Sequence, residues 1–162
     1  MSNVLCLEDF TLGQVIELGS TSVSAEEIVQ FGRAYDPQAF HVDPEAAARS
    51  PFGDLIASEW HTAALFMRLY TDQILLRSAC LGSPGVSDLR WRSPVRPGQV
   101  LHARVTIERV EPSAKRDDRG TVWPVCEFRD DAGETIFSMI LLTLLRRRSA
   151  APGASEARRT AS

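Results

Sequence analysis

The chain has 162 residues, of which 44% are hydrophobic and 24% are charged, the composition of an ordinary globular protein with one domain and its own core. Its formal net charge of −3 argues against nucleic acid or an anionic membrane as a main partner, because both select basic surfaces. Its longest apolar stretches fall short of the ~20 residues of a membrane span, so no membrane segment is predicted.

The three cysteines are Cys6, Cys80 and Cys126, which are widely spaced and odd in number. They form no CxxC pair, so the sequence predicts neither a disulfide framework nor a cysteine-based zinc site. Free thiols fit a reducing compartment. The N-terminal residues carry acidic side chains and lack the long apolar stretch of a secretory signal. We therefore expect a cytoplasmic protein.

The first part of the chain combines one predicted strand with short helices. Residues 14–23 are rich in β-branched and small residues, which is typical of a strand. Ser24 and Glu27 have the spacing of a capping box, so residues 25–34 are predicted to form a helix. Residues 44–49 begin with a proline, which favours the first position of a second helix.

The longest predicted helix covers residues 57–76. Trp60 and Met67 belong to a stripe of apolar side chains at helical spacing, so both are predicted to lie in the core. Further leucine and phenylalanine side chains widen the apolar surface beyond this stripe. A helix with so much apolar surface is expected to be buried on several sides.

The second half of the chain is predicted to be a series of strands that follow a turn at residues 82–85. The strand candidates are residues 86–93, 99–111, 121–129 and 134–146. The segments between them are turn-forming, so consecutive strands are expected to pair antiparallel. One long helix against an antiparallel sheet is an α+β architecture, and a long helix wrapped by a curved sheet is called a hotdog fold.

The domain boundary is predicted near the C-terminus. Residues 1–147 contain all the predicted elements and are expected to form the single domain. Residues 148–162 are mostly small and polar, so they are predicted to be a disordered tail.

Asp36 and His41 lie five residues apart in a segment that Pro37 interrupts. A carboxylate can orient an imidazole and tune its titration near neutral pH, so the two residues can work as an acid–base pair. Taken alone, Asp36 is equally well explained as a turn-forming residue before a proline. A lone histidine such as His41 is more often a packed or solvent-facing residue than a catalytic one. No metal site is predicted, because the three histidines are not at ligand spacing with carboxylates or cysteines.

Three segments of the sequence occur together: YDPQAFHVDPEAA, then SPFGDLIASEWHTAAL, then LRWRSPVRPGQVL. In this order and spacing they resemble the MaoC-like acyl dehydratase family, whose best-known members are the (R)-specific enoyl-CoA hydratases. The resemblance extends over residues 8–147. Asp36 and His41 take the positions of the aspartate and histidine of the family pattern, and Phe40 takes its apolar position. Residues 95–98 resemble the Arg-Pro-Gly turn of the family.

The resemblance implies a hotdog fold and a lyase that adds water to a trans-2-enoyl thioester or removes it from a 3-hydroxyacyl thioester. Asp36 and His41 would activate one water together. Backbone N–H groups around Ser58 and Glu59 would bind the thioester oxygen, at a helix N-terminus that favours negative charge. The implied partners are an acyl-CoA or acyl-carrier-protein thioester and further copies of the chain in a homodimer or higher homo-oligomer. No cofactor is implied beyond the coenzyme A of the substrate.

The sequence departs from the family pattern at three places. Tyr35 replaces a glycine, and Gln38 with Ala39 replaces an Asn-Pro pair, although Gln38 keeps an amide. Glu59 replaces the glycine at the start of the long helix whose N–H is credited with holding the thioester oxygen. A carboxylate that points inward there would oppose an oxyanion. Two alternatives therefore stay open: a hotdog acyl-CoA thioesterase, and a catalytically impaired domain that only binds an acyl thioester.

Other candidate residues are less specific. His61, one turn into the long helix, is expected to have a structural or substrate-lining role rather than a catalytic one. Arg90, Arg92 and Arg96 either meet the phosphates of coenzyme A or form a solvated strand face.

Overall fold

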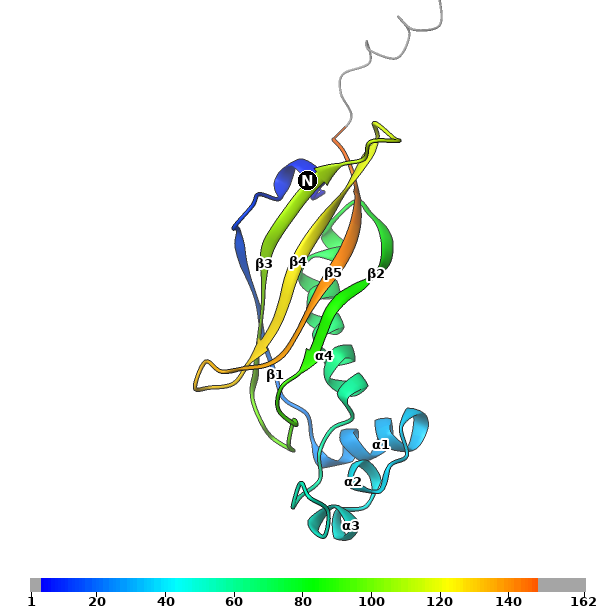
Figure 1. Ribbon diagram of the computed structural model, residues 1–162, viewed down its shortest axis with the longest axis vertical. Helices are drawn as coiled ribbons and strands as arrows, with labels where there is room; N and C mark the ends of the chain where they lie inside the picture. The colour runs from blue at the N-terminus through cyan, green and yellow to red at the C-terminus, as the bar shows by residue number, and fades with distance from the viewer. Residues whose placement is uncertain (1–3, 149–162) are drawn as a thin grey trace, which may run out of the picture.

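The computed structural model describes residues 4–148, which form a five-stranded antiparallel sheet, one long helix and a group of short helices (Figure 1). The strands are β1 (Val15–Thr21), β2 (Cys80–Trp91), β3 (Leu101–Pro112), β4 (Arg119–Arg129) and β5 (Thr135–Arg146). The helices are α1 (Ala25–Tyr35), α2 (Ala39–Val42), α3 (Pro44–Ala48) and α4 (Glu59–Gln73), with 3-10 turns η1 (Leu7–Asp9) and η2 (Leu75–Arg77). The predicted α+β hotdog architecture is confirmed. Apart from Arg148, the predicted tail lies outside the described residues.

The strand order in the sheet is β1-β3-β4-β5-β2. The predicted hairpins β3–β4 and β4–β5 are present, but β2 pairs with β5 at the far edge, so the expectation that β2 pairs with β3 was wrong. The link at residues 92–100 is a crossover with its own anchors. The carbonyl of buried Val95 accepts a hydrogen bond from the N–H of Ala57 (2.8 Å), and the N–H of Gly98 donates to the carbonyl of Val23 (2.8 Å).

The predicted turn at residues 82–85 is instead part of β2. Gly82 has a φ of 117°, and the pairing of β2 with β5 shifts register on both sides of it. The glycines therefore mark an irregular edge strand with bulges, which is a usual role of glycine within a strand.

Helix α4 packs against the concave side of the sheet (Figure 1). Phe66 is fully buried against Phe128 and Phe137, and the hydroxyl of Tyr70 is 3.0 Å from the hydroxyl of Thr143 on β5. Trp60 is 61% exposed, so its predicted place in the core was wrong. Because α4 has apolar residues on most of its sides, the sequence alone does not indicate which of them face the sheet.

Helices α1, α2 and α3 gather at one end of the molecule, beside the N-terminus of α4 (Figure 1). The predicted capping box is present, because Ser24 accepts a hydrogen bond from the N–H of Glu27 and Glu27 accepts one from the N–H of Ser24. Helix α2 was not predicted. It packs against Gly32 of α1, where a Cβ would lie 3.0 Å from the carbonyl oxygen of His41. No helix of the described chain is long and apolar enough to cross a membrane.

Candidate active site

His41 occupies the centre of the site. Its side chain is fully buried on α2, and Nδ1 lies 2.8 Å from the carbonyl oxygen of Ile56. A carbonyl oxygen only accepts hydrogen bonds, so Nδ1 carries the proton. The lone pair of the neutral ring is then on Nε2, on the opposite side of the imidazole.

Asp36, at the C-terminal end of α1, lies on that opposite side. Its Oδ2 is 3.4 Å from Nε2 of His41 and accepts a hydrogen bond of 2.7 Å from the hydroxyl of Ser58. Its Oδ1 accepts from the side-chain amide of Gln38 (2.9 Å). The Ser58 hydroxyl, followed by the Gln38 amide, lowers the pKa of Asp36 against an opposing effect of burial. Asp36 is therefore a carboxylate at neutral pH.

The N-terminus of α4 completes this side of the site. Ser58 is fully buried and caps the helix, because its hydroxyl also accepts a hydrogen bond from the N–H of Trp60 (3.3 Å). Among the described residues, no hydrogen bond uses the N–H groups of Ser58 or Glu59. Free N–H groups at a helix N-terminus suit an anion or a developing oxyanion.

The Glu59 carboxylate points toward the pair. Its Oε2 lies 3.8 Å from Nε2 of His41, although the side chain is 45% exposed. The ligand atoms of Asp36, His41 and Glu59 lie within 4.8 Å of one another. The prediction of no metal site was based on the spacing of the histidines along the chain. That spacing does not show that Glu59 lies close to Asp36 and His41 in the folded protein.

Phe40 and His61, the remaining predicted site residues, have different surroundings. Phe40 packs edge-on against the ring of His41, with 4.6 Å between centroids, and so covers one side of the imidazole. His61 is stacked on Phe31 of α1, with 4.4 Å between centroids. Burial lowers the pKa of His61, and Glu27 acts in the opposite direction. These contacts place His61 in the packing between α4 and α1.

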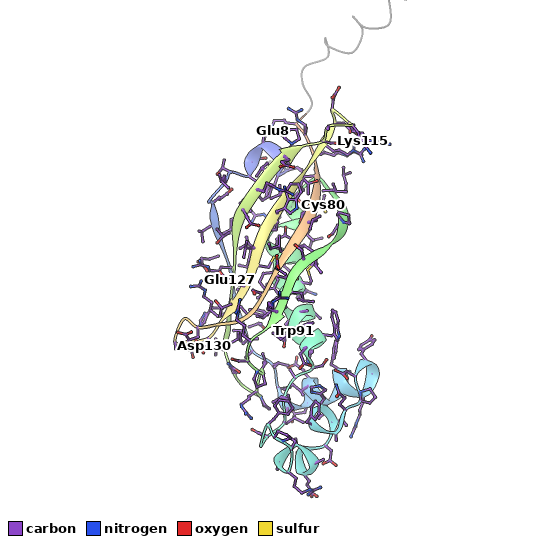
Figure 2. All side chains as sticks on the ribbon, viewed as in Figure 1. Glu8, Cys80, Trp91, Lys115, Glu127 and Asp130 are labelled. Carbon is purple, nitrogen blue, oxygen red and sulfur yellow. The ribbon has the colours of Figure 1, made fainter. Side chains whose placement is uncertain are left out.

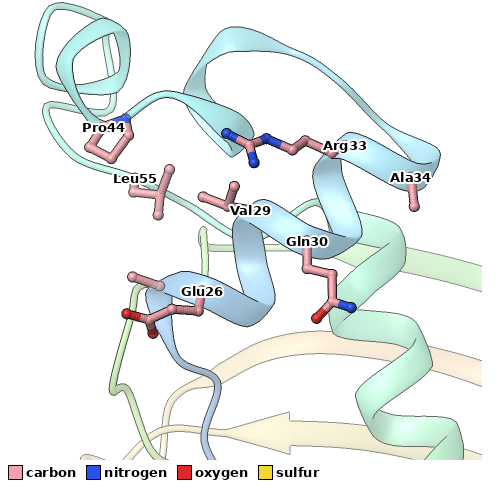
Figure 3. Close-up of a pocket in the computed structure, with 8 residues that line it drawn as sticks. Glu26, Val29, Gln30, Arg33, Ala34, Pro44 and Leu55 are labelled. Carbon is pink, nitrogen blue, oxygen red and sulfur yellow. The ribbon is translucent and has the colours of Figure 1, made fainter.

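Two hollows lie near the helices. The smaller, about 180 Å³, adjoins the site and is lined by Ala57, Glu59, Thr62 and Arg92, with Trp91 at the adjacent end of β2 (Figure 2). A larger apolar hollow of about 650 Å³ lies between α1, Pro44 and Leu55 (Figure 3). Neither lining contains Asp36 or His41, but the smaller hollow is lined by Glu59, whose Oε2 lies 3.8 Å from His41 Nε2. The smaller hollow is therefore the better place for the reacting group of a substrate.

The three arginines that were predicted to meet coenzyme A or solvent make different contacts. Arg96 donates a hydrogen bond to the carbonyl of Phe52 (2.8 Å), which is a structural contact. Arg90 Nη2 lies 3.9 Å from Asp88 Oδ1, and both side chains are exposed. Arg92 lines the smaller hollow. The hydrogen bond between His41 and the carbonyl of Ile56 could not be predicted from the sequence, because a residue of any type supplies a backbone carbonyl.

The long helix α4 against a five-stranded antiparallel sheet defines a hotdog protein. A similar solved structure is the MaoC-like dehydratase from Rhodospirillum rubrum, with a TM-score of 0.83 and 36% identity over 90% of this chain and 99% of that chain. Residues 9–122 match the model of the family described as MaoC like domain, and the chain belongs to this family.

Two curated relatives have different descriptions. The 3-hydroxyacyl-thioester dehydratase Z of Mycobacterium tuberculosis is 32% identical over 113 residues, which cover 68% of this chain and 75% of the relative. The uncharacterized protein YdeM of Bacillus subtilis is 28% identical over 141 residues, which cover 87% of this chain and 99% of the relative.

Proposed function

We propose that the protein hydrates trans-2-enoyl thioesters, or dehydrates 3-hydroxyacyl thioesters, with Asp36 and His41 as the catalytic pair. The observation that carries this proposal is the geometry at Nε2 of His41. This buried nitrogen lies 3.4 Å from an ionised Asp36, beside the free N–H groups at the start of α4. Membership of the MaoC-like family and the printed name of dehydratase Z support the same chemistry.

The geometry suggests which residue takes the proton of the water and which groups bind the thioester oxygen. A water between Asp36 and His41 can donate one hydrogen bond to each. An imidazole is a stronger base than a carboxylate with a lowered pKa, so His41 Nε2 takes the proton while the water oxygen bonds to the β-carbon. The electron pair of the double bond moves to the thioester oxygen, which the N–H groups of Ser58 and Glu59 stabilise. The imidazolium, held by Asp36, then gives its proton to the α-carbon.

Glu59 limits this mechanism. Its Oε2 lies 3.8 Å from His41 Nε2. A negative charge so close to the reacting group repels the negative charge that develops on the enolate oxygen. This observation also favours the second candidate, a thioesterase in which Glu59 activates water for attack on the thioester carbonyl. The third candidate is a domain that binds an acyl thioester and does not turn it over.

The test uses crotonyl-CoA and the loss of the enoyl absorbance. Asp36→Asn and His41→Ala are each expected to lower the rate of hydration by about 100-fold or more, because each removes one member of the acid–base pair. His102 and Asp131 provide a matched control, since they form a second His–Asp pair (2.7 Å) that is exposed. His102→Ala and Asp131→Asn are expected to keep the wild-type rate.

The alternatives give different results in the same assay. Release of free thiol without loss of the enoyl group identifies a thioesterase and contradicts the hydratase. Binding without either reaction, across several acyl chain lengths and with both coenzyme A and acyl carrier protein as carriers, identifies a binding domain. A hydration rate unchanged in Asp36→Asn and His41→Ala contradicts the assignment of the pair.

We further propose that the chain works as a homodimer. Edge strand β2 is mostly exposed, and Val86 on this strand is 49% exposed. Trp60 of α4 packs edge-on against Trp91 of β2 while remaining 61% exposed. An exposed strand edge beside exposed aromatic surface suits pairing with another chain. The absence of a cofactor and the cytoplasmic location remain predictions.

A further inference from the structure

Three side chains of types that can bind a metal ion, Asp36, His41 and Glu59, converge beside the N-terminus of α4. Asp36 Oδ2 and Glu59 Oε2 lie 3.4 and 3.8 Å from His41 Nε2, and the three ligand atoms are all within 4.8 Å of one another. In a tetrahedral zinc site of usual bond lengths, ligand atoms are roughly 3.4 Å apart. The two distances from His41 Nε2 are close to that spacing.

His41 gives an independent reason to expect a cation. Its side chain is fully buried, yet Nε2 has no hydrogen-bond partner within residues 4–148. The hydrogen bond from Nδ1 to the Ile56 carbonyl fixes the tautomer and the ring orientation, as such contacts do for metal-binding histidines. The lone pair of the neutral ring therefore faces two carboxylates, and a positive ion between the three groups removes this repulsion.

The surroundings suit a small divalent ion of the transition series. Ser58 and Gln38 hold the Asp36 carboxylate in place with hydrogen bonds, which is the usual support for a metal ligand. Glu59 is 45% exposed, so an ion has a path from solvent and water can complete its coordination. One imidazole with two carboxylates favours Zn²⁺ or Co²⁺ over Mg²⁺, which prefers oxygen ligands only.

We propose that Asp36, His41 and Glu59 bind one divalent transition-metal ion, with Zn²⁺ as the representative ion. This inference goes beyond the proposed hydration and does not depend on it, because metal binding is measured without substrate. An ion on Nε2 occupies the lone pair that the hydration mechanism uses, so Zn²⁺ is expected to inhibit an active hydratase.

The experiment titrates the full chain, freed of metal by a chelator, with Zn²⁺ in a calorimeter and with Co²⁺ in an absorption spectrometer. We expect one ion per chain, with micromolar or tighter affinity, and a visible Co²⁺ band typical of a low-coordinate site. Glu59→Gln is expected to weaken binding by about tenfold or more. Mg²⁺ at the same concentrations is expected not to bind.

Control variants test the other groups that attract such ions. Asp131→Asn removes a carboxylate from the exposed His102–Asp131 pair, and the double change Cys6→Ser with Cys80→Ser removes two partly buried thiols. Both variants are expected to bind Zn²⁺ as the wild type does.

Three results would overturn the proposal: no saturable binding, binding unchanged by Glu59→Gln, or binding lost in a control variant. Glu59 is the partly exposed first residue of α4, so its replacement should leave the fold intact, which thermal unfolding without metal will check. The outcome is separate from that of the hydration assay. A hydratase without metal affinity and a metal-binding protein without hydratase activity are distinguishable results.

Discussion

Ser58 has two roles, because one hydroxyl both donates to Asp36 and caps α4. It is the largest cause of the lowered pKa of Asp36. A carboxyl group whose pKa is lowered in the folded state stabilises the fold at pH values above its ordinary pKa of 3.8. This contribution is lost as the pH falls through the lowered pKa. The stability of the fold and the charge of Asp36 are thus linked through one side chain.

Ser58→Ala is expected to raise the pKa of Asp36, because the donor that favours its ionised form is removed. The acidic limb of the kcat/KM profile should then move to higher pH, and NMR titration of the Asp36 carboxyl carbon should show the same direction. Loss of the cap is expected to cost about 1 kcal/mol of unfolding free energy.

Ser24→Ala is the matched control for this change. Ser24 caps α1 in a similar way, and its side chain pairs with Glu27 rather than with Asp36. Its removal should cost a similar amount of stability and leave the titration of Asp36 in place. An unchanged Asp36 titration in Ser58→Ala would contradict the assigned role of the hydroxyl.

At the scale of elements, the contact between α1 and α2 positions His41. Gly32 allows this contact, because a Cβ at that position would meet Val42 Cγ1 at 2.9 Å and the carbonyl oxygen of His41 at 3.0 Å. The side chain of Val42 can rotate away. The main chain of His41 cannot move without disturbing the hydrogen bond from Nδ1 to Ile56.

Gly32→Ala is therefore expected to destabilise the protein, although glycine-to-alanine changes within helices usually stabilise by ~1 kcal/mol. We expect a net loss of about 1–3 kcal/mol, the usual cost of overpacking, together with a lower hydration rate. Chemical denaturation and the crotonyl-CoA assay measure the two effects.

Gly85→Ala is the control for Gly32→Ala, because a Cβ at Gly85 would have no atom within 4 Å. Its stability is expected to stay within about 0.5 kcal/mol of the wild type. If Gly32→Ala proves as stable as the wild type, the helix contact does not have the rigidity described above.

The sequence predicted elements well where the signal was local. The alternating residues of β3 and the turns around β4 identified a meander, and the capping box identified the start of α1. The position of β2 at the far edge could not be predicted, because it depends on pairing with β5, which is distant along the chain. The site shows the same division, since Asp36 and His41 are five residues apart while Glu59 joins them only in three dimensions.

At the scale of the whole molecule, the two edges of the sheet make the dimer testable. Val86 on β2 and Val15 on β1 are similarly exposed, at 49% and 51%, and lie on opposite edges. Val86→Lys is expected to dissociate the dimer, because a charged side chain on an edge strand opposes pairing. Val15→Lys should remain dimeric. Sedimentation of the wild type as a stable monomer at micromolar concentration would contradict the proposed dimer.

The two ends of the described chain are held together at the end of the sheet away from helices α1 to α3 (Figure 1). The guanidinium of Arg148 contacts both carboxylate oxygens of Asp9 at 2.6 Å, and its backbone N–H donates to Glu8 at 2.9 Å. A fusion partner, purification tag or surface tether that begins directly before residue 4 or after Arg148 therefore starts far from Asp36 and His41. Immobilised or fused forms should leave access to the pair unobstructed, provided that Arg148 is retained.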